Sequence, residues 1–348
     1  MRQLTRTALV GIICLYHLQG KLCGEKATFM KAVLIRKFGP PDVMKVEEVE
    51  MPALADNQVR VRVRYSSVNP VDWRIRNGSL KFIYGSRFPM RLGFDIAGEV
   101  EETGRSVTRF SKGDRVFGML NYKVRGAYAE FACTEEKLLA LIPWYIDFSE
   151  AAAMPLAGLT SFQALYNKGN IEDYDSVLIN GASGGVGSFA VQIAKAAGCN
   201  VTAVCGTDHV EHVKALGADR VIDRLKQDFT RMPDKYAIIF DAVGKLTFCR
   251  VRRNLTKDGR YITTLPNKPA DIACFLLLPV LSFFGYRKSS AFITVRPGGE
   301  DLSRLALLVK EKKLVPLIDR TFDLEDIAAA HAYSETGRAA GKILIKIA

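Results

Sequence analysis

Three small residues at a fixed spacing mark the segment of this chain best suited to bind a phosphate. Ala182, Gly184 and Gly187 have the spacing of a Gly-x-Gly-x-x-Gly turn, with alanine at the first position. Such a turn lets the backbone approach a pyrophosphate and lets the following helix pack closely against the preceding strand. The free N–H groups at the helix N-terminus then attract the anion. An ordinary tight turn is the alternative for a glycine pattern taken alone.

The flanking residues have the order that this chemistry needs. An apolar run over residues 177–179 predicts a strand before the turn, and a helix follows up to Gly198. Further strands are predicted at 200–205, 221–222 and 237–244, with a helix over 209–217. This alternation favours a dinucleotide-binding domain. The turn residues expected to contact the cofactor are Ala182, Ser183, Gly184, Gly185, Val186 and Gly187.

The end of the second predicted strand favours NADPH over NADH. NAD-dependent enzymes usually place an acid there, where it binds the ribose 2′-hydroxyl. Here Cys205, Gly206 and Thr207 occupy that place, and none of them repels a 2′-phosphate, although Asp208 comes next. For Arg224, which follows the third predicted strand, a solvated surface side chain is the alternative. The residues predicted to contact the cofactor beyond the turn are Gly206, Thr207, His209, Arg224 and Val243.

Composition excludes several classes of protein. The chain has 348 residues, of which 48% are hydrophobic and 25% charged, which is typical of a globular protein. Its net charge of +12 is dispersed, so nucleic-acid binding is not expected, and an excess of positive charge suits a polyanionic cofactor. Arg60, Arg62 and Arg64 alternate with valines and predict the polar face of a half-buried strand. Seven scattered cysteines indicate reduced thiols and a cytoplasmic location.

Two apolar runs need separate interpretations. Arg2 and Arg6 precede an apolar run over 7–18, which resembles a secretory signal without a clear cleavage site. Our leading interpretation of residues 1–29 is a reading frame extended upstream of a true start at Met30; a membrane anchor or an exported form is the alternative. The run over 272–285 contains Pro279 and is too short to span a bilayer. A buried segment or subunit contact ranks first for it, ahead of a lid over the cleft or a weak membrane contact.

The remaining segments predict an α/β protein of two domains. Short strands at 31–35, 58–68, 94–101, 114–117 and 128–133 are typical of a small β-barrel. Strands and helices then alternate from about 155 to 265, as in a parallel sheet covered on both faces. The tail predicts helices over 302–312 and 324–334 and strands over 318–322 and 342–347.

Four sequence blocks carry a resemblance to a known family. They are Asn-Pro-Val-Asp-Trp-Arg-Ile-Arg-Asn-Gly at 69–78, the segments 93–100 and 112–118, the segments 126–131 and 151–160, and the glycine turn. From Met30 onward the chain resembles the medium-chain dehydrogenase/reductase superfamily, in its zinc-free quinone-oxidoreductase-like branch. The resemblance implies a Rossmann-type doubly wound parallel sheet inserted in a GroES-like β-barrel catalytic domain. The boundaries expected are 30–153 and 295–348 for the catalytic domain, and 154–294 for the Rossmann domain.

The resemblance also bears on metal chemistry. Zinc-dependent relatives have a cysteine at the position of Asn69 and Gly-His-Glu at 93–95, where this chain has Gly93, Phe94 and Asp95. An amide and a phenyl ring do not ligate zinc, and residues 99–118 contain no cysteine for a structural zinc site. We therefore expect no metal.

The activity implied is hydride transfer from NADPH to a quinone, or to the activated C=C of an α,β-unsaturated carbonyl. A zinc-free alcohol or aldehyde reductase and a non-catalytic NADPH-binding protein are the alternatives. A homodimer is usual in the family. By position, the catalytic candidates are Asn69, Asp72 and Tyr128, with Tyr84 as a second phenol; Thr160, Arg338 and Lys342 are further cofactor contacts. A turn residue is the alternative for Asn69, a helix cap for Thr160, and a packing aromatic for each tyrosine.

Overall fold

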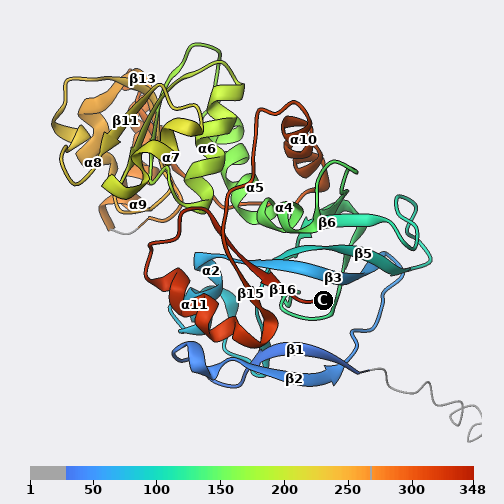
Figure 1. The fold of residues 1–348 in the computed structure, drawn as a ribbon. Coiled ribbons are helices and arrows are strands. Elements are labelled where there is room, and N and C mark those ends of the chain that lie inside the picture. The colour runs from blue at the N-terminus through green and yellow to red at the C-terminus, as the bar shows by residue number, and fades with distance from the viewer. Residues whose placement is uncertain (1–28, 267–268) are drawn as a thin grey trace, which may run out of the picture.

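The chain forms two lobes in the computed structural model, which describes residues 29–266 and 269–348 (Figure 1). Residues 1–28, which carry the predicted N-terminal segment, lie outside the described residues. The helices α4 (Phe148–Ala153) and α5 (Pro155–Gln163) lie at the junction: α4 contacts strands of the first lobe, and α5 contacts α6 (Gly185–Ala196) of the second. The architecture is the α/β fold expected from the sequence.

The second lobe is a six-stranded parallel sheet in the order β11-β10-β9-β12-β13-β14. The first strand in sequence, β9, is central, and the chain winds outward from it in both directions. The carboxyl ends of β9, β10 and β12 therefore share the edge where such sheets bind ligands. Its strands are β9 (Ser176–Asn180), β10 (Asn200–Cys205), β11 (Arg220–Asp223), β12 (Tyr236–Asp241), β13 (Leu255–Thr263) and β14 (Ser289–Phe292), and its helices are α6, α7 (Val210–Ala215), α8 (Phe248–Val251) and α9 (Pro269–Ser282).

The first lobe contains a seven-stranded sheet in the order β15-β16-β3-β5-β6-β8, with β7 paired to β3, and a three-stranded sheet β2-β1-β4. The last strand, β16, lies between β15 and β3, so the C-terminus completes a sheet that the N-terminal half begins. The strands are β1 (Phe29–Ile35), β2 (Lys45–Glu50), β3 (Gln58–Val68), β4 (Met90–Arg91), β5 (Asp95–Thr103), β6 (Arg115–Met119), β7 (Phe131–Glu135), β8 (Leu139–Leu141), β15 (Ile318–Asp323) and β16 (Lys342–Lys346), and the helices are α2 (Pro70–Arg76), α3 (Lys81–Tyr84), α10 (Gly299–Lys310) and α11 (Ile327–Glu335).

Short helical turns connect these elements. A π-helical turn, η3 (Ala164–Lys168), extends α5. The 3₁₀ turns are η1 (Pro41–Val43), η2 (Glu136–Leu138), η4 (Thr207–His209), η5 (Phe229–Arg231), η6 (Arg252–Asn254) and η7 (Leu324–Asp326).

The alternation predicted for β3 is confirmed. Val59, Val61 and Val63 are buried in the core of the first lobe. The arginines between and after them form ion pairs with glutamates of the neighbouring strand β5, at 2.7 Å for Arg62 and Glu101. Each of the three arginines is therefore matched by a glutamate of the same sheet, so they do not contribute to the net positive charge.

Two predicted elements differ from the structure. The strand predicted at 128–133 starts only at Phe131, because the residues before it pair with β1: the N–H of Val33 donates to Tyr128 O at 2.9 Å. The apolar run over 272–285 was expected first to be buried or a subunit contact. Burial is wrong for one side of α9 and for the turn after it, since Leu276 in the helix is 70% exposed and Phe283 in the turn is 89% exposed. Within the described residues, no helix combines the length and the apolar character that crossing a membrane requires.

Candidate active site

The glycine turn has the geometry of a nucleotide-binding loop. Gly184 is the N-cap of the twelve-residue helix α6, and no side chain caps that end. A Cβ at Gly187 would lie 2.1 Å from Gly181 O, so only glycine permits this approach of helix and strand. Gly181 has φ +83°, which explains why alanine is accepted at Ala182: the left-handed residue lies one position earlier. The free N–H groups and absent side chains fit a pyrophosphate.

The end of β10 provides room and charge for a further anion. Arg224 follows β11, and its guanidinium lies 3.8 Å from the position that a Cβ on Gly206 would take. Arg224 forms no ion pair among the described residues. Thr207 donates its hydroxyl hydrogen to Asp223 Oδ2 at 2.7 Å, so that hydrogen is not directed to a ligand in this arrangement. Asp223 is an acid that the sequence reasoning did not consider here.

Lys342, at the start of β16, joins the glycine turn to the catalytic lobe. A Cβ at Gly185 would lie 2.9 Å from Cδ of Lys342, so the lysine stem packs against the turn. Its ammonium group donates to Oδ1 of Asn69 at 2.6 Å and lies 3.4 Å from Oδ2 of Asp95. The side chain is buried, and this burial lowers the pKa of Lys342 against the opposing effect of Asp95. One side chain therefore contacts both halves of the predicted site.

Asp95 is the acceptor on which this network converges. Its Oδ2 accepts hydrogen bonds from Ser67 Oγ at 2.6 Å and from Asn69 Nδ2 at 2.8 Å. Its Oδ1 accepts from the N–H of Leu156 at 2.8 Å, in the first turn of α5. A buried carboxylate is tolerated only when it is paired in this way. Asp95 thus ties β5, the Asn69 loop and α5 together at the junction of the lobes.

Asp72 fixes two loops of the catalytic lobe. The N–H of Asn69 donates to its Oδ2 at 2.8 Å, and the N–H of Gly93 donates to its Oδ1 at 3.2 Å. The first bond belongs to the capping box that begins α2, with Pro70 in its first turn. Full burial raises the pKa of Asp72 to about 7, with a smaller contribution from the Asp95 carboxylate. The alternative expected for Asn69 was a turn residue before Pro70; in the structure Asn69 is the N-cap of α2, and its side chain also contacts Lys342 and Asp95.

Tyr128 belongs to the same buried network. Its hydroxyl donates to Oδ2 of Asp72 at 3.0 Å and lies 3.3 Å from Nε2 of His331 in α11. Nδ1 of His331 lies 3.3 Å from Nη1 of Arg76, whose other amino group pairs with Glu335. Burial lowers the pKa of His331 to about 3 and raises that of Tyr128 well above its usual value. Both groups are therefore neutral at physiological pH, and the placement of Tyr128 favours a positioning role.

Tyr84 is the more accessible of the two candidate phenols. It lies at the end of α3 and makes edge-on aromatic contacts with Phe94 and Tyr122. Arg125 donates to Tyr84 O at 3.3 Å and lies over the ring. Partial burial raises the pKa of Tyr84, and the nearby Asp72 carboxylate adds to that effect. Tyr84 therefore keeps its proton at neutral pH while lying near the Asp72 network.

The other predicted cofactor contacts are more dispersed. Thr160 is buried within α5 and donates to Leu156 O at 2.7 Å, so it is not a helix cap. Val243 follows β12 and lies over Gly181, within 2.3 Å of the position of an added Cβ. Arg338 is exposed in the turn before β16, and His209 is half-buried in η4. Ser183 and Val186 remain half-buried in the glycine turn.

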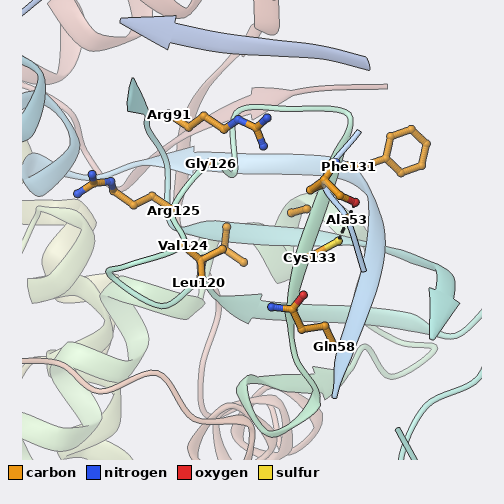
Figure 2. Close-up of a pocket in the computed structure, with 11 residues that line it drawn as sticks. Ala53, Gln58, Arg91, Leu120, Val124, Arg125, Gly126, Phe131 and Cys133 are labelled. Carbon is orange, nitrogen blue, oxygen red and sulfur yellow. Dashed lines mark hydrogen bonds between the residues drawn. The ribbon is translucent and has the colours of Figure 1, made fainter. Parts of the chain in front are cut away.

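A separate cavity of about 150 Å³ lies in the catalytic lobe beside β7 (Figure 2). Gln58, Cys133 and the loop at 120–126 line it, and none of the predicted site residues does. The guanidinium groups of Arg91 and Arg125 point in opposite directions in Figure 2. They do not converge on a common anion, so this cavity is not the candidate active site.

The sequence reasoning missed several members of the network, among them Asp95, His331 and Arg76. Asp95 had a detectable signal, because it interrupts an otherwise apolar run at 92–97, and a carboxylate in a buried strand needs partners. His331 and Arg76 are 255 residues apart in the chain. Only the packing of α11 on α2 brings them together, and no local pattern indicates it.

Comparisons with known proteins agree with this geometry. Residues 55–144 match the family described as alcohol dehydrogenase GroES-like domain, and residues 216–345 match the family described as zinc-binding dehydrogenase. A chloroplast envelope quinone oxidoreductase homolog of Arabidopsis thaliana is 34% identical over 86% of this chain and 92% of its own. An NADPH-dependent alkenal/one oxidoreductase of the same plant is 32% identical over 91% of this chain and 79% of its own.

Solved structures give the same result. The structure of the quinone oxidoreductase from Coxiella burnetii superimposes with a TM-score of 0.82, at 31% identity, over 92% of this chain and all of that one. The GroES-like match, the parallel nucleotide-binding sheet and these relatives confirm the resemblance and the fold expected from the sequence. This chain belongs to the medium-chain dehydrogenase/reductase superfamily, in its quinone-oxidoreductase-like branch.

Proposed function

We propose that this chain is an NADPH-dependent oxidoreductase that reduces quinones or the activated C=C of α,β-unsaturated carbonyls. The observation that carries the proposal is the double contact of Lys342, with its stem on the glycine turn and its ammonium on Asn69 and Asp95. The relatives named above as a quinone oxidoreductase homolog and an NADPH-dependent alkenal/one oxidoreductase support the substrate class. A non-catalytic NADPH-binding protein and an alcohol or aldehyde reductase are less well supported.

The residues that would hold the cofactor are those of the turn at 181–187 and the end of β10. The N–H groups that begin α6 would donate to the pyrophosphate, and Arg224 would pair with the 2′-phosphate. The stem of Lys342 packs against Gly185 of the turn, and its ammonium group reaches the catalytic lobe. The bound nicotinamide would supply the hydride, and the protein would contribute binding, orientation and electrostatics.

The chain's own polar groups are suited to stabilise the negative charge that develops on the substrate oxygen. The ammonium of Lys342 is a fixed positive charge in a site of low dielectric constant, where its effect is larger than in water. Asp95 and Asp72 hold Lys342 and the Asn69 loop in place, so we assign both acids, with Tyr128, as positioning residues. Asn69 donates to Asp95 in this arrangement and would donate to substrate only after exchanging that partner.

We propose Tyr84 as the proton donor to the reduced substrate. It is half-buried beside Phe94 and Tyr122, and its raised pKa keeps it protonated. Tyr84→Phe is expected to lower kcat about 100-fold with NADPH affinity unchanged, the size usual for loss of a general acid. A loss of less than about threefold would refute this assignment.

We also propose that the reaction needs no metal. Among residues 29–266 and 269–348, no group of three or more His, Cys, Asp or Glu side chains could hold an ion. The support for the proposal is chemical: Asn69 and Phe94 stand where zinc-dependent relatives have ligands. Stoichiometric zinc in elemental analysis, removed by chelation with loss of activity, would contradict it.

A substrate panel tests the proposed function directly. The purified full chain is incubated with NADPH and a series of quinones, alkenals, saturated aldehydes and alcohols, and NADPH consumption is followed by absorbance. Turnover is expected with quinones or alkenals and not with saturated aldehydes. Tight NADPH binding without turnover on any acceptor would favour the non-catalytic alternative.

Three further expectations remain proposals. We propose domain limits of 30–153 with 295–348 and 154–294, a homodimer, and a cytoplasmic location. Limited proteolysis tests the limits, sedimentation equilibrium the oligomeric state, and fractionation of the native cell the location.

A further inference from the structure

His331 is a buried histidine of the catalytic lobe that the proposed reaction leaves without a role. It lies in α11, its side chain is fully buried, and its ring lies edge-on to that of Tyr128, with 5.6 Å between the ring centres. One ring nitrogen faces Arg76 and the other faces the Tyr128 hydroxyl. Buried polar groups require such partners, and the chemistry of the partners decides which atom holds each hydrogen.

The guanidinium of Arg76 fixes the tautomer of His331. Its Nε donates to Gly39 O at 3.1 Å, and its Nη2 pairs with Glu335. Nη1 is thereby held 3.3 Å from Nδ1 of His331. A guanidinium only donates hydrogen bonds, so Nδ1 must accept. A neutral imidazole carries a single N–H, which therefore lies on Nε2.

The hydrogen on Nε2 determines what the Tyr128 hydroxyl does. Because Nε2 is a donor, the hydroxyl accepts from it at 3.3 Å and cannot donate to His331. Within the described residues, the acceptors left for the Tyr128 hydrogen are Oδ2 of Asp72 at 3.0 Å and, at a longer 3.5 Å, Ser67 O. The shorter contact directs the hydrogen to the carboxylate. Donation into a hydroxyl group strengthens the hydrogen bond that the same group donates.

This chain of hydrogen bonds is not a route for protons to or from solvent. Burial, together with the neighbouring Arg76 charge, lowers the pKa of His331 to about 3, so the ring stays neutral at physiological pH. Arg76 closes the outer end of the chain, and a guanidinium accepts no proton. What the chain transmits is therefore orientation and polarisation, directed from α11 toward Asp72.

Asp72 passes this orientation to the loop that carries Asn69. Its Oδ2, the oxygen that accepts from Tyr128, also accepts from the N–H of Asn69 at 2.8 Å. The side chain of Asn69 accepts from the Lys342 ammonium at 2.6 Å. Lys342 and α11 belong to the same C-terminal segment. That segment therefore holds Asn69 twice, by Lys342 at its side chain and by the chain from His331 at its backbone.

We propose that His331 is a positioning residue for the reduction, acting through Tyr128 and Asp72 on the Asn69 loop. The effect on turnover rests on the proposed function, whereas the effect on Asp72 does not. Burial raises the pKa of Asp72 and the Tyr128 hydrogen bond lowers it, so weakening that bond raises the pKa further. The groups that face Asp72 are the N–H groups of Asn69 and Gly93, the Tyr128 hydroxyl, and the charges of Asp95 and Lys342.

Two substitutions in the full chain separate the two hydrogen bonds of His331. His331→Asn keeps an oxygen near the position of Nδ1, where it accepts from Arg76, and is too short to reach Tyr128. His331→Gln places an amide N–H near the position of Nε2, where it donates to Tyr128, and gives up the acceptor for Arg76. Each variant loses one buried hydrogen bond, so a purely structural role predicts similar losses from both. Thermal melting checks that both remain folded.

Of the two, His331→Asn should have the larger effect on catalysis. Its kcat should fall about tenfold with NADPH affinity unchanged, and His331→Gln should recover most of that loss. In urea unfolding of His331→Asn, the fall in stability with rising pH should extend above about pH 7, because protonated Asp72 stabilises the fold up to its raised pKa. His331 is neutral over this range and does not itself cause the shift. The control His212→Gln replaces an exposed histidine and should match the wild type.

The Tyr128→Phe background removes the hydroxyl through which His331 acts. In that background His331→Asn should change neither kcat nor the pH profile any further. The proposal is overturned if His331→Asn has the same effect in both backgrounds, if the Asn and Gln variants lose kcat equally, or if His331→Asn leaves the pH profile unchanged. A wild type that turns over no acceptor would instead refute the proposed function, and the pH profile would still decide whether His331 acts on Asp72.

Discussion

Replacing Lys342 by methionine tests the contact on which the proposed site depends. Methionine keeps an unbranched stem against the glycine turn but removes the charge that lies 3.4 Å from Asp95. Breaking a buried ion pair costs about 3–5 kcal/mol, because the remaining charge loses its partner. Asp95 keeps three other donors, from Ser67, Asn69 and Leu156, so we expect a loss of ~3 kcal/mol in the free energy of unfolding, at the lower end of that range.

Urea unfolding, together with steady-state rates of NADPH consumption, measures the effect. Lys346→Met on the same strand is the control, since Lys346 is exposed and such substitutions change stability by less than about 0.5 kcal/mol. In the Asp95→Asn background the carboxylate charge is gone, so Lys342→Met should cost ~1 kcal/mol or less. The Lys342 variant should also lose kcat by more than its loss of NADPH affinity, because the stem that supports Gly185 is retained.

Equal costs of Lys342→Met in the wild-type and Asp95→Asn backgrounds would refute this reasoning. The two side chains would then act independently, and the network at the lobe junction would not be held by their charges. A kcat equal to that of the wild type would separately remove Lys342 from the proposed mechanism.

The remaining predictions concern an acid, a glycine and an arginine. Asp72 has a pKa of about 7 when folded, against 3.8 ordinarily, so its contribution to stability is present in acid and is lost as pH rises from about 4 to 7. Asp72→Asn should abolish that fall in urea unfolding, and an unchanged pH profile would contradict the burial argument. Gly187→Ala, whose Cβ would meet Gly181 O, should weaken NADPH binding at least tenfold by fluorescence titration, while Gly298→Ala, which has open space, should not. Arg224→Ala should lower NADPH affinity about tenfold and leave NADH affinity unchanged; an unaltered ratio would exclude Arg224 as the phosphate contact.

The fold was accessible from the sequence because its signals are local. The glycine turn, the strands at 200–205 and 58–68, and the α6 stop at Gly198 each follow from a short pattern of apolar, glycine or β-branched residues. The four sequence blocks that resemble the family then indicated how these elements are arranged in two lobes. The start of β7 was misplaced because residues 128–130 cross from one sheet to the other, which depends on their pairing with β1.

The site was only partly accessible for the opposite reason. Asn69 and Asp72 are close in sequence and form a capping box, so their cooperation follows from their spacing. The convergence of Lys342 on Asp95 joins residues 247 apart, and that of His331 on Tyr128 joins residues 203 apart. Such contacts arise from the packing of whole elements, and a single sequence carries no periodic trace of them.

The position of β16 has a consequence for how the protein is made. Its strand partners β15 and β3 stand on either side of it, and Lys342 is its first residue. The nucleotide-binding lobe is complete well before this strand leaves the ribosome, and domains fold as units during synthesis. A nascent chain could thus capture its coenzyme while the other lobe still has a gap in its sheet. Premature termination near the last codons would then yield a protein that sequesters coenzyme and turns nothing over.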